Sequence, residues 1–321
     1  MKSLIFGVCG QDGSFLAEYL LSLGYDVVGV GRKDITYYPS YVRLLNESPR
    51  FEYIVADVLD QSAIAHIMNE YEPYNIYNVS GQTNVFGSFN NAALTFRTNI
   101  EPCLAILENM RIAKFPSKFF QACSSEMYGS GGTKNENSEF KPLSPYGISK
   151  LAAHRLVDLY RSRYSLFAVS GILFNHESTR RGFNFVTRKI ARYAAELSLN
   201  KTKKPLELGN LEGTRDFGYA PSFVRGMHST LMCDSPDDYV FGTGQLTSVQ
   251  QLCEIAFKYI GKDWKSYVQS VTHYFRPVDF VEAVADTTKA KNVLGWKNSK
   301  TITSMMEEMI NHEQKEICSK A

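Results

Sequence analysis

The sequence predicts an α/β protein: a doubly wound parallel sheet with a smaller C-terminal α/β cap. Three observations predict this architecture. Short apolar strands alternate with helical patterns through the first half of the chain, a glycine-rich turn follows the first strand, and the alternation loosens beyond about residue 175. Strands that alternate with helices favour a parallel sheet, because each parallel connection needs a crossover. We therefore expect a sheet domain over residues 1–174 and a cap over residues 175–321, with pieces of the cap interleaved with the sheet.

The expected elements of the sheet domain follow in chain order. Each expected strand is a short apolar run, and each expected helix repeats apolar residues three and four positions apart. In order, these elements are a strand at 4–8, a helix at 14–23 that Gly24 ends, strands at 26–31 and 51–56, a helix at 61–71, a strand at 75–79, a helix at 92–111, a strand at 118–123, a helix at 145–164 and a strand at 167–173. In the cap the helical period predicts helices at 186–199, 249–260 and 302–315.

Composition excludes several classes of protein. The chain has 321 residues, 44% hydrophobic and 21% charged, which suits a globular protein with a full core. A net charge of +2 without a basic stripe argues against nucleic acid as the main partner. No apolar run reaches the length of a membrane span, and the first residues predict a strand rather than a signal peptide. The 6 cysteines form no Cys-x-x-Cys pair, so we expect reduced thiols in a cytoplasmic protein.

The glycine turn after the first strand predicts a nucleotide site. Gly7, Gly10 and Gly13 are spaced Gly-x-x-Gly-x-x-Gly between a strand and a helix, with Gln11 and Asp12 among them. Glycines there allow a tight turn and close approach of the backbone to a pyrophosphate, which then faces the helix N-terminus. The alternative interpretation is a turn that is rich in glycine only for packing.

Residues after the second and third strands bear on the choice of dinucleotide. Arg32 and Lys33 follow the second strand, where an NAD site usually places a carboxylate and an NADP site an arginine. The sequence thus favours NADP, while Asp34 keeps NAD as an alternative. Asp57 and Val58 end the third strand, in position to meet the adenine. A carboxylate that caps the next helix is the competing interpretation of Asp57.

Two short segments about twenty residues apart carry the candidate catalytic groups. Tyr146 and Lys150 are four residues apart, so they share one face of a helix. An ammonium beside a phenol favours the phenolate, which predicts a lowered tyrosine pKa and a useful base. Ser124 can hydrogen-bond to the same substrate oxygen, and Glu126 is a further acid or base that suggests chemistry beyond oxidation. The competing interpretation is an ordinary surface Tyr and Lys.

With these motifs located, the chain resembles the extended short-chain dehydrogenase/reductase superfamily, and within it the GDP-mannose 4,6-dehydratase family. The resemblance covers almost the whole length and implies a Rossmann sheet with a nucleotide-sugar-binding cap. Its most specific block is Asn175-His176-Glu177-Ser178, followed by Val186-Thr187-Arg188-Lys189. The other matching stretches are 10–18, 121–129, 144–150 and 208–218.

The resemblance implies roles for individual residues. The catalytic group is Ser124, in place of the family's Thr, with Glu126, Tyr146 and Lys150. The implied cofactor contacts are Gly7, Gly10, Gln11, Asp12, Gly13, Arg32, Asp57, Val58, Gln82, Tyr146, Lys150, His176 and Arg181. The implied contacts to a GDP-sugar are Ser125, Asn175, Val186, Lys189, Arg215, Arg276 and Asp279. Three of these are cations that can neutralise a diphosphate. No metal ligand is implied.

The implied function is that of a GDP-sugar 4,6-dehydratase for GDP-mannose or a close relative such as GDP-manno-heptose. C4 is oxidised by NADP+, Glu126 drives loss of water across C5–C6, and hydride returns to C6, giving a GDP-4-keto-6-deoxy sugar. A GDP-sugar 4-dehydrogenase, 4-epimerase or reductase on the same fold is the nearest alternative, because none of these needs a base at C5. A non-catalytic dinucleotide-binding regulator is the remote alternative.

Departures from the family pattern concern the sugar pocket and the assembly. Residues 80–85 read Ser-Gly-Gln-Thr-Asn-Val, a family Tyr is Leu94, and the residues after Gly218 differ. These changes leave the exact sugar open. The resemblance implies a homodimer through the helices at 92–111 and 145–164. A homotetramer is the alternative, although the loop after Arg32 is shorter here than in the family.

Overall fold

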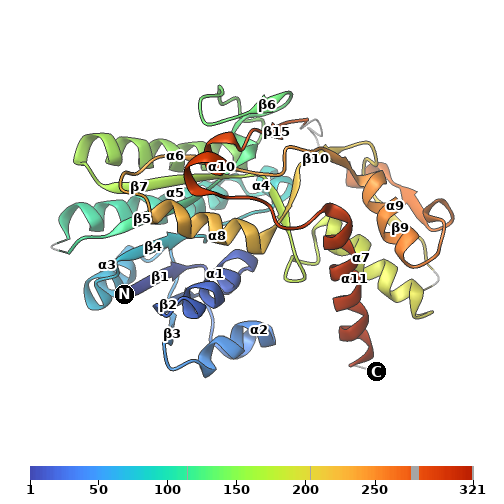
Figure 1. Cartoon of the computed structure of the whole chain (residues 1–321), viewed down its shortest axis with the longest axis horizontal. Coiled ribbons are helices and arrows are strands. Elements are labelled where there is room, and N and C mark those ends of the chain that lie inside the picture. Colours follow the sequence, from blue (N-terminus) through green and yellow to red (C-terminus); the bar gives the residue numbers. More distant parts are fainter. Residues whose placement is uncertain (114, 203, 276–281, 320–321) are drawn as a thin grey trace.

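A seven-stranded sheet with helices on both faces forms the larger part of the molecule, and a smaller body lies beside it (Figure 1). The structure is a computed structural model that describes residues 1–113, 115–202, 204–275 and 282–319. Arg276 and Asp279, both expected to contact substrate, lie outside the described residues. No helix within the described ranges is long and apolar enough to cross a membrane.

The sheet has the strand order β12-β7-β5-β4-β1-β2-β3, and every neighbouring pair is parallel. Its strands are β1 Lys2–Phe6, β2 Asp26–Gly31, β3 Phe51–Val55, β4 Asn75–Asn78, β5 Lys118–Ser124, β7 Phe167–Leu173 and β12 Tyr239–Phe241. From β1 the chain winds one way through β2 and β3, then the other way through β4, β5 and β7. The winding therefore reverses between β1 and β4, and ligands of such sheets bind at the carboxyl ends of the strands there.

Alternate side chains of each strand enter two separate cores, as the pleat requires. Leu4 and Phe6 lie in the core covered by α3 Gln61–Tyr71, α5 Ala92–Ile112 and α6 Pro145–Tyr164. Ile5 lies in the core of the other face, which is covered by α1 Gln11–Ser22, α8 Ala220–Leu231 and α10 Thr288–Leu294. Both cores are fully buried at their centres, so the sheet is a rigid platform for the loops at its edge.

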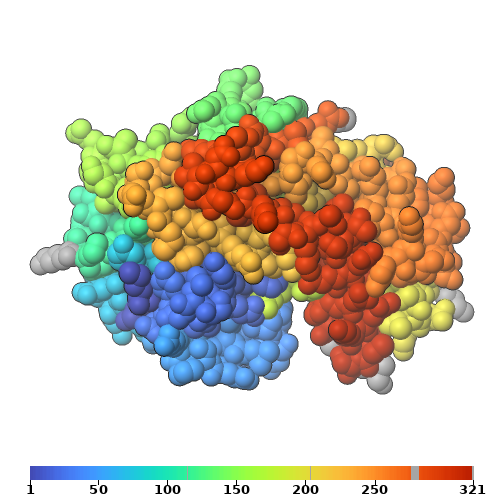
Figure 2. Space-filling model, viewed as in Figure 1, coloured from blue at the N-terminus to red at the C-terminus, as the bar shows by residue number. Residues whose placement is uncertain are grey.

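The smaller body has its own hydrophobic core. Helices α7 Val186–Ser198, α9 Val249–Tyr259 and α11 Ile302–Cys318 pack together with the pair β9 Leu206–Leu208 and β14 Val268–Ser270. The space-filling view shows a notch between the amino-terminal part of the chain, in blue, and α11, in red (Figure 2). The other short strand pairs of the described residues are β8 Asn175–Glu177 with β11 Phe217–Tyr219, β10 Thr214–Arg215 with β13 Thr247–Ser248, and β6 Thr133–Lys134 with β15 Val284–Ala285.

Short helices complete the described elements. They are α2 Ser40–Arg43, α4 Val85–Asn90 and 3-10 turns at Ile35–Tyr37, Leu44–Glu47, Ser125–Met127, Trp264–Ser266 and Thr272–Tyr274.

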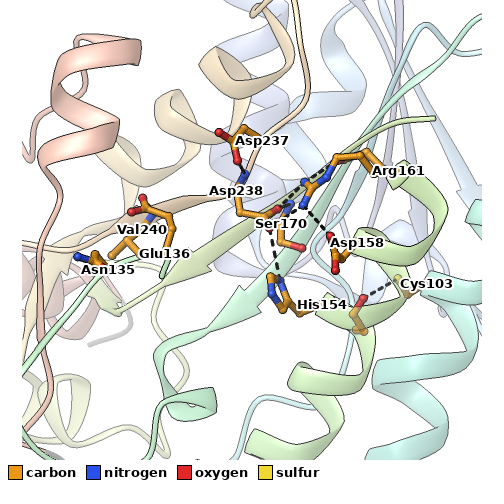
Figure 3. A network of polar contacts seen from close by, with 12 residues as sticks. Cys103, Asn135, Glu136, His154, Asp158, Arg161, Ser170, Asp237, Asp238 and Val240 are labelled. Atoms are coloured by element: carbon orange, nitrogen blue, oxygen red, sulfur yellow. Dashed lines mark hydrogen bonds and ion pairs between the residues drawn. The ribbon is translucent and has the colours of Figure 1, made fainter. Parts of the chain in front are cut away.

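The edge strand β12 is fastened by a polar network (Figure 3). The Asp238 carboxylate accepts two hydrogen bonds from the Arg161 guanidinium, both of 2.8 Å, and one of 2.9 Å from the Ser170 backbone N–H. Arg161 lies on α6 and Ser170 on β7, so one carboxylate ties the last strand to its neighbours. His154 Nδ1 lies 4.0 Å from the same carboxylate.

The predicted fold class is confirmed, with corrections to individual elements. The first strand ends at Phe6 and not at residue 8, because Gly7 (φ +89°) begins the turn. The first helix begins at Gln11, three residues before the expected start. β12 and α8 were not predicted, since β12 has 3 residues and α8 carries Pro221 and an interior glycine.

Candidate active site

The candidate site lies at the carboxyl ends of β1, β4 and β5, where the winding of the sheet reverses. The glycine turn follows β1, Gln82 follows β4, and Ser124 ends β5. Gln82 is tied through Asn99 to α6, the helix that carries Tyr146 and Lys150. The Gln82 N–H donates to Asn99 Oδ1 (2.9 Å), and Asn99 Nδ2 donates to Ser149 Oγ on α6 (2.9 Å). The loop after β4 is thereby fixed to α5 and α6.

The glycine turn is a cradle without room for side chains. A Cβ on Gly7 would lie 2.8 Å from the Ser80 backbone, and a Cβ on Gly13 would lie 2.3 Å from the Gly7 carbonyl oxygen. Gly10 is the N-cap of α1, and no side chain caps the first turn. The N–H groups of that turn therefore have no side-chain acceptor. An anion that binds there is stabilised by the helix N-terminus.

Gln11, Asp12 and His176 form one network across the turn. His176 Nε2 lies 2.9 Å from Asp12 Oδ2, and Gln11 Nε2 donates to the His176 carbonyl oxygen (3.0 Å). The Ser178 hydroxyl donates to Gln11 Oε1 (2.7 Å). Burial lowers the pKa of His176, but the Asp12 charge and hydrogen bond outweigh it, so the net pKa is raised. Burial raises the pKa of Asp12, and His176 brings it below its usual value.

Arg181 extends this network. Its Nε lies 3.0 Å from Glu177 Oε2, and its guanidinium stacks on the Phe185 ring at 3.6 Å. Glu177 is 1% exposed and also accepts a hydrogen bond from the Thr187 hydroxyl. The sequence interpretation missed Glu177, although its place four residues before Arg181 is the signal that could have found it.

The residues after β2 and β3 lie beside the turn. Arg32 is exposed, and the Tyr53 hydroxyl donates to the Lys33 carbonyl oxygen (2.6 Å), which fixes the segment that carries Arg32. The Asp34 carboxylate accepts from the Thr36 N–H (2.9 Å), so a local turn already uses it.

The competing interpretation of Asp57 as a helix cap is wrong. Asp60 caps α3, accepting from the backbone N–H groups of Ser62 and Ala63. The Asp57 carboxylate instead accepts from the Leu59 N–H (3.0 Å). Val58 packs against the core under α3 and α5.

A glycine contact brings the catalytic candidates together. Ser144 caps α6 by accepting from the Gly147 N–H (3.0 Å), which places Tyr146 in the first turn. A Cβ on Gly147 would lie 2.6 Å from the Glu126 carbonyl oxygen, so α6 approaches the 3-10 turn Ser125–Met127 as closely as backbones allow. The Ser124 hydroxyl accepts from the Glu126 N–H (3.2 Å).

The electrostatics of Tyr146 differ from the sequence prediction. Burial raises the Tyr146 pKa well above its usual value, while the hydrogen bond to Ser124 acts in the opposite direction. The Lys150 ammonium donates to the Ala122 carbonyl oxygen (2.9 Å) and lies 5.9 Å from the centre of the Tyr146 ring. The expected lowering of the tyrosine pKa by Lys150 is therefore wrong for this arrangement. Burial lowers the pKa of Lys150 itself.

The expected substrate residues line the side of the site toward the smaller body. Asn175 lies on β8, Val186 and Lys189 on the first turn of α7, and Arg215 on β10. Ser125 is buried beside Glu126. The Lys189 ammonium lies 5.4 Å from the centre of the Tyr274 ring, and Arg215 Nη1 donates to the Thr214 carbonyl oxygen (2.7 Å). Within the described ranges, no group of three or more His, Cys, Asp or Glu side chains is arranged to hold a metal ion.

Comparison with known proteins identifies close relatives in sequence. The profile of the GDP-mannose 4,6 dehydratase family matches residues 4–309. GDP-mannose 4,6 dehydratase 2 of Arabidopsis thaliana is 38% identical, over 97% of this chain and 86% of that protein. The human GDP-mannose 4,6 dehydratase is 37% identical, over 96% of this chain and 90% of that protein. The enzyme of that name from Sinorhizobium fredii is also 37% identical, over 97% of this chain and 96% of the relative.

Solved structures share the fold. A UDP-glucuronic acid 4-epimerase of Bacillus cereus, in complex with UDP-glucuronic acid and NAD, has a TM-score of 0.86 at 22% identity and covers 98% of this chain and 99% of its own. A dTDP-glucose 4,6-dehydratase of Bacillus anthracis, in complex with NAD, has a TM-score of 0.85 at 21% identity, with 98% and 97% covered. At this identity the likeness concerns the fold.

Proposed function

The chain belongs to the GDP-mannose 4,6-dehydratase family, and we propose that it converts GDP-mannose or a close relative to a GDP-4-keto-6-deoxy sugar with NADP as its resident cofactor. The observation that supports it best is the placement of Glu126. The negative charge of the Glu126 carboxylate contributes to raising the Tyr146 pKa. The Glu126 backbone contacts α6 at Gly147, next to Tyr146. Oxidation at C4 alone does not need this second acid/base, whereas elimination across C5–C6 does.

The residues of the site fit a dinucleotide. The glycine cradle excludes side chains at Gly7 and Gly13, and the first turn of α1 presents its N–H groups without a side-chain cap. Gly7, Gly10 and Gly13 would hold the pyrophosphate together with the network of Gln11, Asp12 and His176. When bound, NADP+ would supply the hydride acceptor for C4 of the sugar and the hydride donor for C6, so no net oxidant would be consumed.

The protein's own groups move the protons. Tyr146 takes the proton of the 4-hydroxyl as a phenolate, a form that burial disfavours. The hydrogen bond to Ser124 acts against burial, as would the positive charge of bound NADP+, and Ser124 also polarises the sugar oxygen. Lys150 supplies buried positive charge on the same helix face, held by the Ala122 carbonyl oxygen. The 4-ketone acidifies the C5 hydrogen, which Glu126 removes. Glu126 then supplies the proton that leaves with the 6-hydroxyl as water, with buried Ser125 beside it. When hydride is delivered to C6, C5 takes up one proton, which balances the 4-hydroxyl proton that Tyr146 removed.

The nucleotide end of the substrate is assigned to the smaller body. Lys189 and Arg215 carry positive charge at the edge of the site and can neutralise a diphosphate. Arg276 and Asp279 complete the proposed set, together with Asn175 and Val186. A manno-heptose remains the alternative sugar, because the segment at 80–85 that follows β4 departs from the family pattern.

Assembly and compartment complete the proposal. Exposed apolar side chains on α5 and α6, among them Leu104, Ile112 and Leu159, support a homodimer through these two helices. A homotetramer, which in the family involves the loop after Arg32, is the larger alternative. All 6 cysteines are free thiols, which fits a cytoplasmic enzyme.

One mass measurement tests the proposed function. The protein is incubated with GDP-mannose, or with GDP-manno-heptose, and a catalytic amount of NADP+, and the mass of the sugar nucleotide is followed. Loss of one water without accumulation of NADPH is the expected result. Conversion of the added NADP+ to NADPH without loss of water would identify a 4-dehydrogenase instead, and no change with either sugar would reject the proposal.

A further inference from the structure

A buried ion cluster joins the last helix to α7, outside the residues assigned above. The Glu313 carboxylate on α11 is 0% exposed. It forms ion pairs with two guanidinium groups of α7, that of Arg188 and that of Arg192, the second at 3.0 Å. Arg192 pairs in addition with Glu196 on its own helix. A fully buried carboxylate is stable only with such partners, so the cluster fixes α11 against α7.

Arg188 differs from Arg192 in what its other nitrogens reach. Arg188 Nη1 donates to the carbonyl oxygens of Thr179 and Arg181, the second at 2.9 Å. Both carbonyls belong to the turn that connects β8 to α7. Arg188 is 7% exposed, so these bonds form in a site that water barely enters. One guanidinium thus binds the Glu313 carboxylate and the backbone of the turn at once.

The turn that Arg188 holds carries groups that contact the glycine cradle. The Ser178 hydroxyl donates to Gln11 Oε1, and the Arg180 guanidinium donates to the Ser14 hydroxyl (3.1 Å) and stacks on Phe15 of α1 at 3.9 Å. The turn therefore lies between α1 on one side and Arg188 on the other. It also carries the Arg181 side chain, which the proposed function assigns to the dinucleotide.

We propose that Arg188 is a positioning residue for the dinucleotide, with Glu313 as its counter-charge. It holds the turn 178–182 so that Gln11 and Arg181 face the dinucleotide, although it does not touch the ligand itself. The inference rests on the proposed function, because it presumes that the glycine cradle binds NADP. A guanidinium is suited to this task, since its planar fork reaches a carboxylate and two carbonyls together.

Three variants separate positioning from stability. Arg188→Gln removes the contacts to the turn and one ion pair. Arg192→Gln removes an ion pair with the same carboxylate but no contact to the turn, so it is the matched control. Arg188→Lys keeps the charge opposite Glu313 and loses the forked geometry. It is the variant to use if Arg188→Gln does not fold. For each, the dissociation constant of NADP+ is measured by titration calorimetry, with the melting temperature alongside.

The expected result is a split between binding and stability. Arg188→Gln and Arg188→Lys weaken NADP+ binding about tenfold, the scale of one or two charge-assisted hydrogen bonds. Arg192→Gln leaves the dissociation constant within about twofold of wild type while its melting temperature falls. Equal NADP+ affinity in the Arg188 variants and the wild type would overturn the inference and leave Arg188 a purely structural residue. A wild-type protein that binds no NADP+ would instead reject the proposed function.

Discussion

Gly147 lies so close to Glu126 that a Cβ at position 147 would sit 2.6 Å from the Glu126 carbonyl oxygen. The contact joins the first turn of α6 to the turn that carries the proposed acid/base. The contact is between the backbones of the two elements, so no side-chain rotation can relieve it. Because position 147 has no Cβ, the segment that carries Tyr146 can lie this close to the turn that carries Glu126.

Gly147→Ala is expected to lower kcat by about 10- to 100-fold, because a displacement approaching 1 Å misaligns the catalytic groups. Alanine is a better helix former than glycine, so the variant should lose activity without losing helix. Steady-state rates of water loss and the circular dichroism spectrum are the measurements. Normal kcat in a folded Gly147→Ala protein would show that this contact does not set the catalytic geometry.

Glu126→Gln is expected to separate oxidation from elimination. The amide cannot remove the C5 proton, so loss of water should fall by about 10²- to 10⁴-fold. C4 oxidation does not need Glu126, so reduced dinucleotide should accumulate and be visible by its absorbance after GDP-mannose is added. Glu139→Gln, at an exposed ion pair with Lys141, is the control and should behave as wild type. Elimination at the normal rate in Glu126→Gln would remove Glu126 from the mechanism.

The sequence predicted the elements with strong periodicity and the motifs that lie close together in the chain. Tyr146 and Lys150 could be placed on one helix face from their spacing alone. The partner of Lys150 could not be predicted, because it is the backbone carbonyl oxygen of Ala122. Every residue has such a carbonyl, so the sequence does not show which one accepts the bond. The burial of Tyr146 is equally invisible in the spacing, and because burial raises its pKa, the expected direction was wrong.

Long-range pairing was also beyond the sequence. Arg188 and Glu313 are separated by 125 positions and sit on helices where any charged residue fits an exposed face. Only the packing of α11 on α7 shows that both are buried. Similarly, α8 was not predicted because Pro221 and Gly226 interrupt the signs of a helix, although it covers one face of the sheet.

Asp238→Asn is expected to loosen the edge strand β12. The variant loses the charge that binds both Arg161 nitrogens, and removing one member of a largely buried ion pair costs about 3 kcal/mol of unfolding free energy. Asp158→Asn is the matched control, because Asp158 pairs with the same Arg161 at 3.5 Å but is half exposed, and it should cost under about 1 kcal/mol. Urea unfolding of the two variants measures the difference, and equal losses would contradict the assigned role.

The stability contributed by His176 and Asp12 is expected to depend on pH. The His176 pKa is raised above 6.5, so its contribution is full below that pH and is lost as the pH rises through the raised value. The Asp12 pKa is lowered below 3.8, so its contribution is full above that pH and is lost as the pH falls through the lowered value. The pair thus stabilises most between these two limits. His176→Gln should lose more unfolding free energy at about pH 5.5 than at about pH 8.5, as measured by urea unfolding. A loss independent of pH would mean that the histidine is not charged.

Arg32→Ala is expected to change the choice of dinucleotide. Arg32 is exposed at the end of β2, and the Tyr53 hydroxyl holds its neighbour Lys33 by the backbone, so the guanidinium is available to a 2′-phosphate. The nearby Asp34 carboxylate already accepts from Thr36, which takes it away from a ribose 2′-hydroxyl. The variant should therefore raise the KM for NADP+ about tenfold and leave the KM for NAD+ nearly unchanged. The ratio of the two constants is the measurement, since a general loss of folding would move both. An equal rise of both KM values, or no rise of either, would show that Arg32 does not bind the 2′-phosphate.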